Sequence, residues 1–282
     1  MKVADVMTPR DDLVTVSIPG TREDVLEYLQ ERAFSSVPVV KETGDGEQYR
    51  GLISREDLIN NPDEDQLAIL MEDVPTTSSD ADIAEVAHLI TETCSRRVPV
   101  VNGGSLQGIV TITDVVRAIA DGAVDGDREV GELARRDINT TYEGTPLRVV
   151  ERELAFAQVP YAVALDEEGE MSGIITEVDI LAVAEVVEGE EGTGDSIANQ
   201  DDDWMWEGIK AVGNRYLPTR NVEFPDATVS EFMTTDVLTV TSKRTARDAA
   251  QMMLNNDVEQ IPLVTGDELT GMVRDVDLVG GL

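Results

Sequence analysis

Four copies of one short phrase constrain the fold of this chain more than any other feature. Each copy reads glycine, two apolar residues, a polar residue, and an aspartate three positions further on. An apolar run behind a glycine is typical of a buried strand, and the polar residue with its aspartate is typical of a helix start. Because the phrase recurs, the chain is predicted to repeat one structural unit four times. The copies are GLISRED from Gly51, GIVTITD from Gly108, GIITEVD from Gly173 and GMVRDVD from Gly271.

A proline inside an apolar run precedes each phrase. The proline lies 13 residues before the glycine in the first and third copies, and 9 residues before it in the second and fourth. The matching spacings indicate that a two-repeat unit was duplicated, which pairs repeat one with two and repeat three with four. The runs are VPVV from Val37, VPVV from Val98, VPYAV from Val159 and IPLV from Ile261.

The first repeat shows the predicted order of elements most clearly. A short strand is followed by an amphipathic helix, the proline-containing strand, a hairpin, the glycine-led strand and a closing helix. In residues, these are the strand 13–16, the helix cap Thr21, the apolar stripe of Val25, Leu26 and Leu29, the strand 37–40, the hairpin around Gly44 and Gly46, and a helix from Ser54.

The predicted fold class is therefore α/β (α+β), with four tandem β-α-β-β-α repeats. The predicted boundaries are 1–64, 65–122, 128–187 and 228–282, with 188–227 as an insert before the last repeat. The insert begins as an acidic linker and ends in an aromatic and basic segment. We expect that segment to be a helix that packs across the third and fourth repeats, and the alternative is a segment that contacts a phosphate or a partner protein. It carries Trp204, Trp206, Lys210, Arg215, Tyr216 and Arg220.

The excess of acidic residues limits which partners the chain can bind and which salt concentrations suit it. The chain has 57 acidic and 22 basic residues, for a formal net charge of -35. Carboxylates at this density repel one another unless ions screen them, and the screening length falls to roughly 3 Å at molar salt. We therefore expect a protein from a salt-rich cytoplasm. A nucleic-acid partner is not expected, because phosphate backbones are bound by clustered lysine and arginine.

Other compositional features exclude further classes of protein. The first residues lack the apolar core of a signal peptide, and no stretch approaches the roughly 18 apolar residues of a membrane span. We expect a cytoplasmic protein with no membrane partner. The single cysteine, Cys94, excludes an internal disulfide, and the single histidine, His88, leaves no Cys/His metal site. Both are expected to be packing or surface residues of the second repeat.

The repeated phrases together resemble those of cystathionine-beta-synthase (CBS) domains, small β-α-β-β-α units that pair into Bateman modules. The resemblance covers nearly the whole chain apart from the insert. The phrases DVMTPRDDLVTV from Asp5 and EFMTTDVLTV from Glu231 match the same family, whereas repeats two and three lack the Met-Thr pair. The resemblance implies two Bateman modules in one chain, and with the acidic composition it points to a halophilic archaeon.

The resemblance also implies a ligand. In CBS domains these phrase positions contact the ribose and phosphates of adenine nucleotides, so AMP, ADP or ATP is the expected ligand and no other cofactor is expected. A helix start favours a phosphate, and an aspartate accepts hydrogen bonds from ribose hydroxyls. The same pattern is also a capping box that needs no ligand, and the sequence alone leaves both open. The matching pairs are Ser54 with Asp57, Thr111 with Asp114, and Thr176 with Asp179.

Basic residues distinguish the second and fourth repeats. Arg96 and Arg97 directly precede Val98, where they resemble the basic pair that meets phosphate in gamma subunits of AMP-activated kinases. They could instead bridge surface carboxylates. In the fourth repeat Arg274 replaces the hydroxyl residue and only Asp277 remains. Arg274 could reach a phosphate or pair with Asp277, and the pairing would close that site.

We therefore predict a non-catalytic regulatory protein that binds adenine nucleotides between paired repeats. The regulated partner is unknown, and a monomeric four-repeat disc is preferred over a homodimer. Alternative hypotheses are a binder of S-adenosylmethionine or its thioadenosine relative, and a ligand-free scaffold that docks a partner through the insert. Inosine monophosphate dehydrogenase, which contains CBS pairs, is excluded because its barrel would require about 250 further residues.

The composition makes one prediction about stability. The melting temperature should fall as KCl is removed, because the screening length grows from about 3 Å at molar salt to about 10 Å at 0.1 M. Thermal unfolding followed over a KCl series measures this directly. A melting temperature that is independent of KCl would refute the proposed adaptation to salt.

Overall fold

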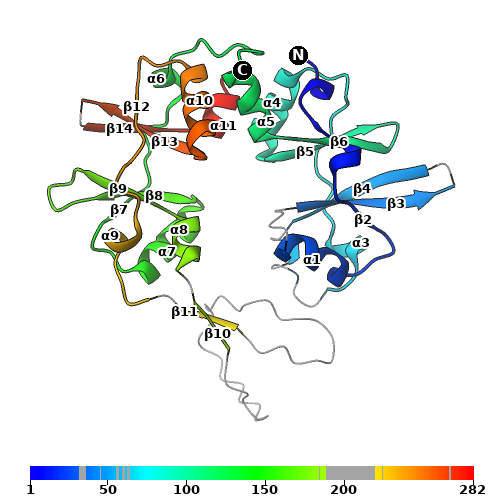
Figure 1. The fold of residues 1–282 in the computed structure, drawn as a ribbon, viewed down its shortest axis with the longest axis horizontal. Coiled ribbons are helices and arrows are strands. Elements are labelled where there is room, and N and C mark those ends of the chain that lie inside the picture. Colours follow the sequence, from blue (N-terminus) through cyan, green and yellow to red (C-terminus); the bar gives the residue numbers. More distant parts are fainter. Residues whose placement is uncertain are drawn as a thin grey trace. The chain divides into compact units, whose positions relative to one another are not determined.

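A computed structural model describes residues 1–31, 36–44, 46–54, 57–58, 61, 64–183, 185–188, 220–223, 225–266 and 268–282. The chain divides into two compact units, each considered by itself below. The first unit comprises residues 1–137 and 238–282, and the second comprises residues 138–237. The first unit therefore contains repeats one and two and most of repeat four, while the second contains most of repeat three and the first residues of repeat four (Figure 1).

Repeat one forms a three-stranded sheet in the order β2-β3-β4. The strand β2 runs parallel to β3, and β3 forms an antiparallel hairpin with β4. Buried Val25 and Val39 belong to a small core beneath this sheet. The elements are η1 (Val3–Asp5), β1 (Thr8–Pro9), η2 (Arg10–Asp12), β2 (Val16–Ser17), α1 (Arg22–Glu31), β3 (Ser36–Thr43) and β4 (Gly46–Ser54).

Repeat two has the same hairpin, here formed by β5 and β6, and two long helices. Its helix α5 has an apolar face of Val115, Val116 and Ile119, all buried. Thr111 caps α5 with the reciprocal hydrogen bonds expected from the sequence. The elements are α3 (Leu67–Leu70), α4 (Ile83–Thr93), β5 (Arg97–Asn102), β6 (Ser105–Thr111) and α5 (Ile112–Ala120).

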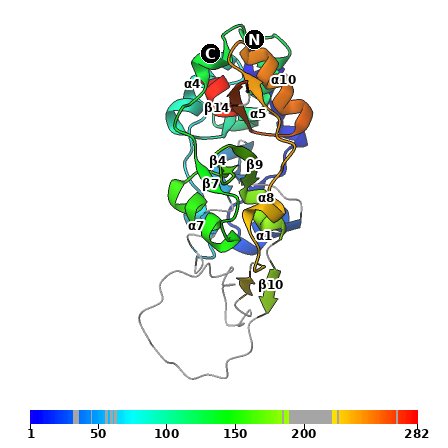
Figure 2. The ribbon, with the colours of Figure 1, turned by 90° about the vertical axis from the view of Figure 1, so that its left-hand side faces the viewer.

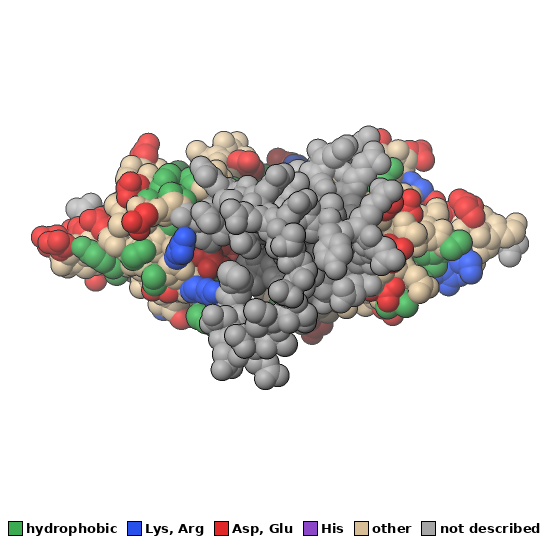
Figure 3. Space-filling view, turned by 90° about the horizontal axis from the view of Figure 1, so that it is seen from below, with side chains coloured by type: hydrophobic (Ala, Val, Ile, Leu, Met, Phe, Trp, Pro, Cys, Tyr) green, Lys and Arg blue, Asp and Glu red, His purple; other side chains and the backbone are tan. Residues whose placement is uncertain are grey.

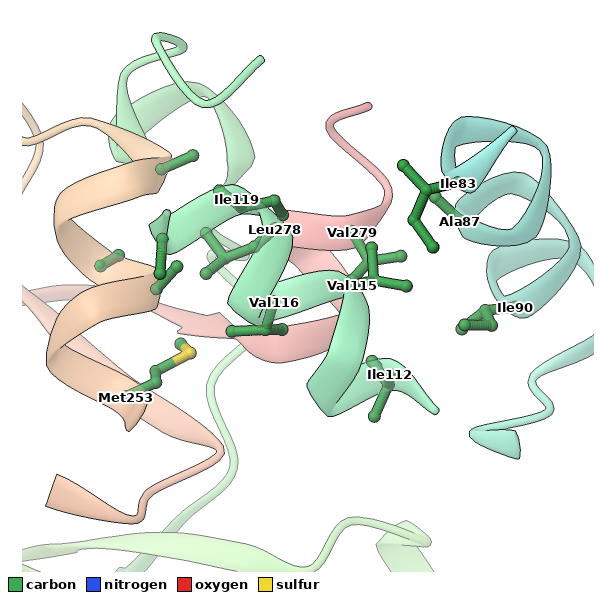
Figure 4. Packing of buried hydrophobic residues seen from close by; sticks show 14 of the residues in the cluster. Ile83, Ala87, Ile90, Ile112, Val115, Val116, Ile119, Met253, Leu278 and Val279 are labelled. Atoms are coloured by element: carbon green, nitrogen blue, oxygen red, sulfur yellow. The ribbon is translucent and has the colours of Figure 1, made fainter. Parts of the chain in front are cut away.

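The body of repeat four lies in the same unit and packs its helices against repeat two. Figure 4 shows α5 between α4 and α10, with Ile119 and Leu278 on neighbouring elements. One continuous apolar core joins the two repeats across these helices, and it includes Ile90, Val116 and Met253. The repeat-four elements in this unit are β12 (Val240–Thr241), α10 (Ala246–Asn256), β13 (Gln260–Thr265), β14 (Glu268–Arg274) and α11 (Asp275–Val279), and α6 (Val130–Leu133) of repeat three lies beside them.

The second unit holds the sheet of repeat three, in the order β7-β8-β9, with its own apolar core around Val150 and Ile175. The strands β10 and β11 pair antiparallel. They follow α8, and Figure 2 shows β10 beyond the end of that helix. The elements are β7 (Thr140–Tyr142), α7 (Leu147–Ala157), β8 (Tyr161–Leu165), β9 (Met171–Thr176), α8 (Glu177–Ala182), β10 (Glu185–Glu188), β11 (Arg220–Glu223) and α9 (Val229–Phe232).

Each repeat places its N-terminal segment on the sheet of its partner repeat. Repeat one lends β1 to β6 of repeat two, and Glu72 of repeat two bonds Leu52 of repeat one in return, with N–O distances of 2.9 and 3.0 Å. The same bridge joins Arg135 of repeat three to Met272 of repeat four. In the second unit, Thr234 of repeat four bridges to β9 of repeat three. This exchange pairs repeat one with two and repeat three with four.

The exchange explains the glycine of the repeated phrase. A Cβ at Gly51 would lie 2.6 Å from the carbonyl oxygen of Glu72, and one at Gly271 would lie 2.7 Å from that of Arg135. A Cβ at Gly108 would meet the carbonyl oxygen of Thr8 in the same way, and one at Gly173 would meet the Met233 side chain at 2.6 Å and the carbonyl oxygen of Thr234 at 2.9 Å. Real Cβ atoms do not approach backbone oxygens this closely, so only glycine admits the partner segment.

The proline-to-glycine spacing proved to be a wrong basis for the pairing. In repeats one, two and four, the proline lies opposite the residue that follows the phrase glycine, as Pro38 does opposite Leu52. In repeat three that position is Val163, opposite Ile174, and Pro160 precedes the strand. The spacing of 13 residues in repeat three was therefore a coincidence, and the pairing rests on the exchange instead.

Other expectations have mixed outcomes. The glycine-led strands are present in all four repeats, and Thr21 precedes α1 as expected. The first strand of repeat one is shorter than the predicted 13–16, because only Val16 and Ser17 pair with β3. Leu26 and Leu29 of the expected stripe lie outside the described side chains, as does the aromatic and basic part of the insert.

The surface charge and the hydropathy of the helices can be compared with what the composition predicts. Figure 3 shows acidic side chains scattered over the described parts of one face, as the composition requires. No helix in the described part of the chain is both long and apolar enough to cross a membrane.

Candidate functional site

The capping box predicted from the phrase is formed in the first three repeats. Asp57 accepts hydrogen bonds from the backbone N–H and the hydroxyl of Ser54, both at 2.7 Å. Asp114 accepts the same pair from Thr111, both at 2.8 Å. Asp179 accepts them from Thr176 at 2.8 and 2.7 Å. The local sequence thus fixes each aspartate against the hydroxyl residue that ends a buried strand.

In every one of these caps the aspartate uses a single oxygen, Oδ2. Among the described residues, none donates a hydrogen bond to Oδ1 of Asp57 or of Asp179. Oδ1 of Asp114 lies 3.2 Å from the guanidinium of Arg117, whose side chain is more than half exposed. The cap therefore occupies only Oδ2 of each aspartate and does not by itself exclude a second hydrogen-bonding role for Oδ1.

Repeat two adds a cation to this arrangement. Arg97 lies directly opposite Thr111 in the β5–β6 hairpin, and opposed residues of an antiparallel pair project from the same face. Arg97 is half-buried, and no described residue pairs with it. Burial lowers the pKa of Arg97, and the neighbouring charge of Arg96 lowers it further, while Glu259 partly offsets both. An incompletely compensated guanidinium beside a capped aspartate is a favourable position for an anionic ligand.

Arg96 points instead to repeat four. Its guanidinium contacts Asp275 at 2.5 and 3.3 Å and Glu259 at 2.9 Å. Burial alone would lower the pKa of Arg96, but the hydrogen bonds and charge of these carboxylates raise it. Of the two roles considered for the basic pair, Arg96 thus bridges carboxylates, whereas Arg97 does not pair with any residue that the structure describes.

Repeat four shows the pairing anticipated for Arg274. The guanidinium donates to both oxygens of Asp277, at 3.0 and 2.9 Å. Arg135 of repeat three approaches the same carboxylate, with its Nε 3.5 Å from Oδ1. Both oxygens of Asp277 are therefore engaged by arginines.

The structure also reveals a position that the sequence reasoning missed. The exchanged N-terminal segments bring Thr8, Glu72, Arg135 and Thr234 to the same place beside the four phrases. The Met-Thr pairs in repeats one and four were a partial signal for it. Glu72 and Arg135 were missed because their neighbours lack that motif. The position differs in charge among the repeats, with an acid beside repeat one and a base beside repeat four.

In the aromatic and basic segment of the insert, Arg220 lies in β11, and the other named residues lie outside the described part.

His88 and Cys94 are surface residues, as the sequence analysis allowed. His88 contacts Glu92 at 3.1 Å one turn further along α4. Within the described ranges, no group of three or more His, Cys, Asp and Glu side chains is placed to hold a metal ion.

Repeat three needs a corrected comparison with repeat two. By the strand register, the positions equivalent to Arg96 and Arg97 are Pro160 and Tyr161. Counting from the prolines Pro99 and Pro160 would instead give Ala157 and Gln158, and those residues end α7 and follow it. Buried Tyr161, opposite Thr176, thus takes the place of the guanidinium.

Comparison with known proteins extends these findings. MJ1404 of Methanocaldococcus jannaschii is 24% identical over 278 residues, covering 98% of this chain and 61% of that protein. This chain therefore spans about three fifths of that relative's length. MJ1225 of the same organism is 24% identical over 256 residues, covering 87% of this chain and 80% of that protein.

Solved structures share the fold. A conserved protein of Pyrococcus horikoshii gives a TM-score of 0.70 at 25% identity, over 99% of this chain and 98% of that one. The crystal structure of MJ1225 gives a TM-score of 0.65 at 20% identity, over 99% of both chains. The family model of the CBS domain matches residues 3–64, 67–121, 130–185 and 229–282. The chain therefore belongs to the CBS domain family, with four CBS domains in tandem.

Proposed function

We propose that this chain is a non-catalytic, cytoplasmic regulatory protein that binds an adenine nucleotide, with repeat two as its principal site. The observation that supports this most is the half-buried Arg97 beside the capped Asp114. In this proposal Asp114 accepts hydrogen bonds from the ribose, and Arg97 with the start of α5 binds the phosphate. The next pair on the same face of the hairpin as Arg97 and Thr111 is Pro99 with Ile109, and these apolar residues provide the dry surroundings that an adenine ring favours.

The charge at Arg97 favours a phosphorylated ligand over S-adenosylmethionine. A phosphate would compensate the guanidinium, whereas the sulfonium of S-adenosylmethionine carries a positive charge of its own. Repeats one and three have the capped aspartate without an equivalent arginine, because Ser36 and Tyr161 lie opposite their hydroxyl residues. We rank them below repeat two, and the fourth repeat last.

Calorimetric titration in molar KCl with AMP, ADP, ATP and S-adenosylmethionine tests the proposal. The wild-type chain should bind at least one phosphorylated ligand, and Asp114→Ala should weaken that binding about tenfold or more, since a hydrogen bond to a charged group contributes about 1.5–3 kcal/mol. Asp57→Ala is the matched control, because it removes the same cap from a repeat that lacks the arginine.

Two outcomes would count against the proposal. Absence of binding heat for every ligand would refute nucleotide binding altogether. An equal loss in Asp114→Ala and Asp57→Ala would refute the assignment to repeat two. Circular dichroism of both variants separates lost binding from lost folding, because removing a helix cap costs about 0.5–2 kcal/mol of stability.

A further inference from the structure

The contact between Arg96 and Asp275 connects the phrases of two repeats that are far apart in sequence. Arg96 directly precedes β5, the strand that begins at Arg97 and borders the repeat-two site, and its carbonyl oxygen accepts a hydrogen bond from Ile112, the first residue of α5. Asp275 is the first residue of α11 and directly follows Arg274. The guanidinium of Arg96 thus leaves its own repeat and ends on the phrase of repeat four.

Separating Asp275 from Arg96 would leave the buried carboxylate of Asp275 without its cation. The residue is only 7% exposed, and its remaining described hydrogen bond is with the backbone N–H of Val276, at 2.7 Å. Arg96 is the cation that the described structure pairs with this carboxylate. Removing a partner from a buried ion pair leaves an uncompensated charge, which is strongly unfavourable. Asp275 therefore keeps the guanidinium of Arg96 on repeat four.

Glu259 reinforces this arrangement. It occupies in repeat four the position that Arg96 occupies in repeat two, and its carbonyl oxygen likewise accepts from the first residue of the closing helix, Asp275. Asp275 and Glu259 both compensate the charge of Arg96, whereas only Glu259 among them offsets part of the charge of Arg97. The contact is asymmetric, because the position of Asp275 is filled in repeat two by the apolar Ile112.

We infer that Asp275, assisted by Glu259, is a positioning residue that lowers the affinity of the repeat-two site for phosphorylated ligands by holding Arg96 in repeat four. This inference rests on the proposed function of that site. Its consequence is reciprocal: a ligand that recruits Arg96 weakens the ion pair between repeats two and four, so binding is coupled to the packing of these repeats.

Calorimetry with AMP and adenosine in molar KCl provides the test, using Asp275→Asn, Glu259→Gln and the wild-type chain. Asp275→Asn keeps an oxygen for the Val276 N–H and removes the charge. We expect its dissociation constant for AMP to fall about fivefold or more, in line with typical couplings between sites. Adenosine, which lacks the phosphate, should bind all variants alike. Asp127→Asn controls for the loss of one negative charge, since Asp127 pairs with Arg247 instead.

The outcomes separate this inference from the proposed function. If the wild-type chain binds AMP through Asp114 but neither Asp275→Asn nor Glu259→Gln binds it more tightly, the role of Asp275 is refuted and the proposed function stands. An equal gain for AMP and adenosine would also refute it, since it would indicate a general loosening of the site. If no chain binds AMP, ADP or ATP, both fail. Glu259 is exposed, so its variant decides the matter if Asp275→Asn does not fold.

Discussion

Leu67→Ala is expected to lower the free energy of unfolding by about 2–5 kcal/mol, the range for a large-to-small change in a well-packed core. Leu67 begins α3, the N-terminal segment of repeat two, but its side chain is fully buried in the core of repeat one. It packs there with Val39 and Ile53, residues of the hairpin that ends in the first phrase. The truncation therefore removes apolar contacts that exist only because the segments are exchanged.

Ile69 provides a matched control two residues away on the same short helix. Its side chain is 61% exposed, so Ile69→Ala should change the free energy of unfolding by no more than about 0.5 kcal/mol. Urea denaturation of both variants at one fixed KCl concentration measures the difference. Equal losses in the two variants would contradict the placement of α3 on repeat one.

Gly271→Ala is expected to lower the free energy of unfolding by about 1–3 kcal/mol or more, as overpacking of a closed site does. The added Cβ would lie 2.7 Å from the carbonyl oxygen of Arg135, which belongs to the backbone and has no flexible end to move aside. The segment of repeat three would have to shift away from β14. The paired bonds between Arg135 and Met272, at 2.8 and 2.9 Å, would weaken with it.

The control for this variant is Gly44→Ala in the first hairpin, where a Cβ would meet no atom within 4 Å. Urea denaturation gives the stability of each variant, and hydrogen exchange reports the local effect. Exchange of the Arg135 and Met272 amides should accelerate in Gly271→Ala beyond the change in global stability. Wild-type stability and unchanged exchange in Gly271→Ala would show that the exchanged segment does not constrain this glycine.

Part of the candidate site was open to prediction because it is local. A hydroxyl residue and an aspartate three positions later interact within a single helical turn, so Ser54, Thr111 and Thr176 could be matched to their aspartates from spacing alone. The pairing of Arg274 with Asp277 has the same spacing, and it was one of two roles considered for that arginine.

Features that depend on contacts between distant segments could not be predicted from the sequence. Arg96 and Asp275 are 179 residues apart, and nothing in their neighbours indicates that they meet. The register of repeat three was misjudged because Pro160 imitates a motif that the strand pairing assigns to Val163. Strand register depends on hydrogen bonds to a partner strand, and a sequence motif reports it only indirectly.

The sequence by itself determined the repeated unit, the four glycine-led strands and the capped aspartates, because each depends on residues within one or two turns of chain. Only the tertiary structure decided why the phrase glycine is required, which residue of an exchanged segment faces each phrase, and where Arg96 points. Those features arise where segments distant in sequence meet. A glycine that admits a partner's backbone and an arginine that compensates another repeat's buried carboxylate are defined by contacts that no local pattern encodes.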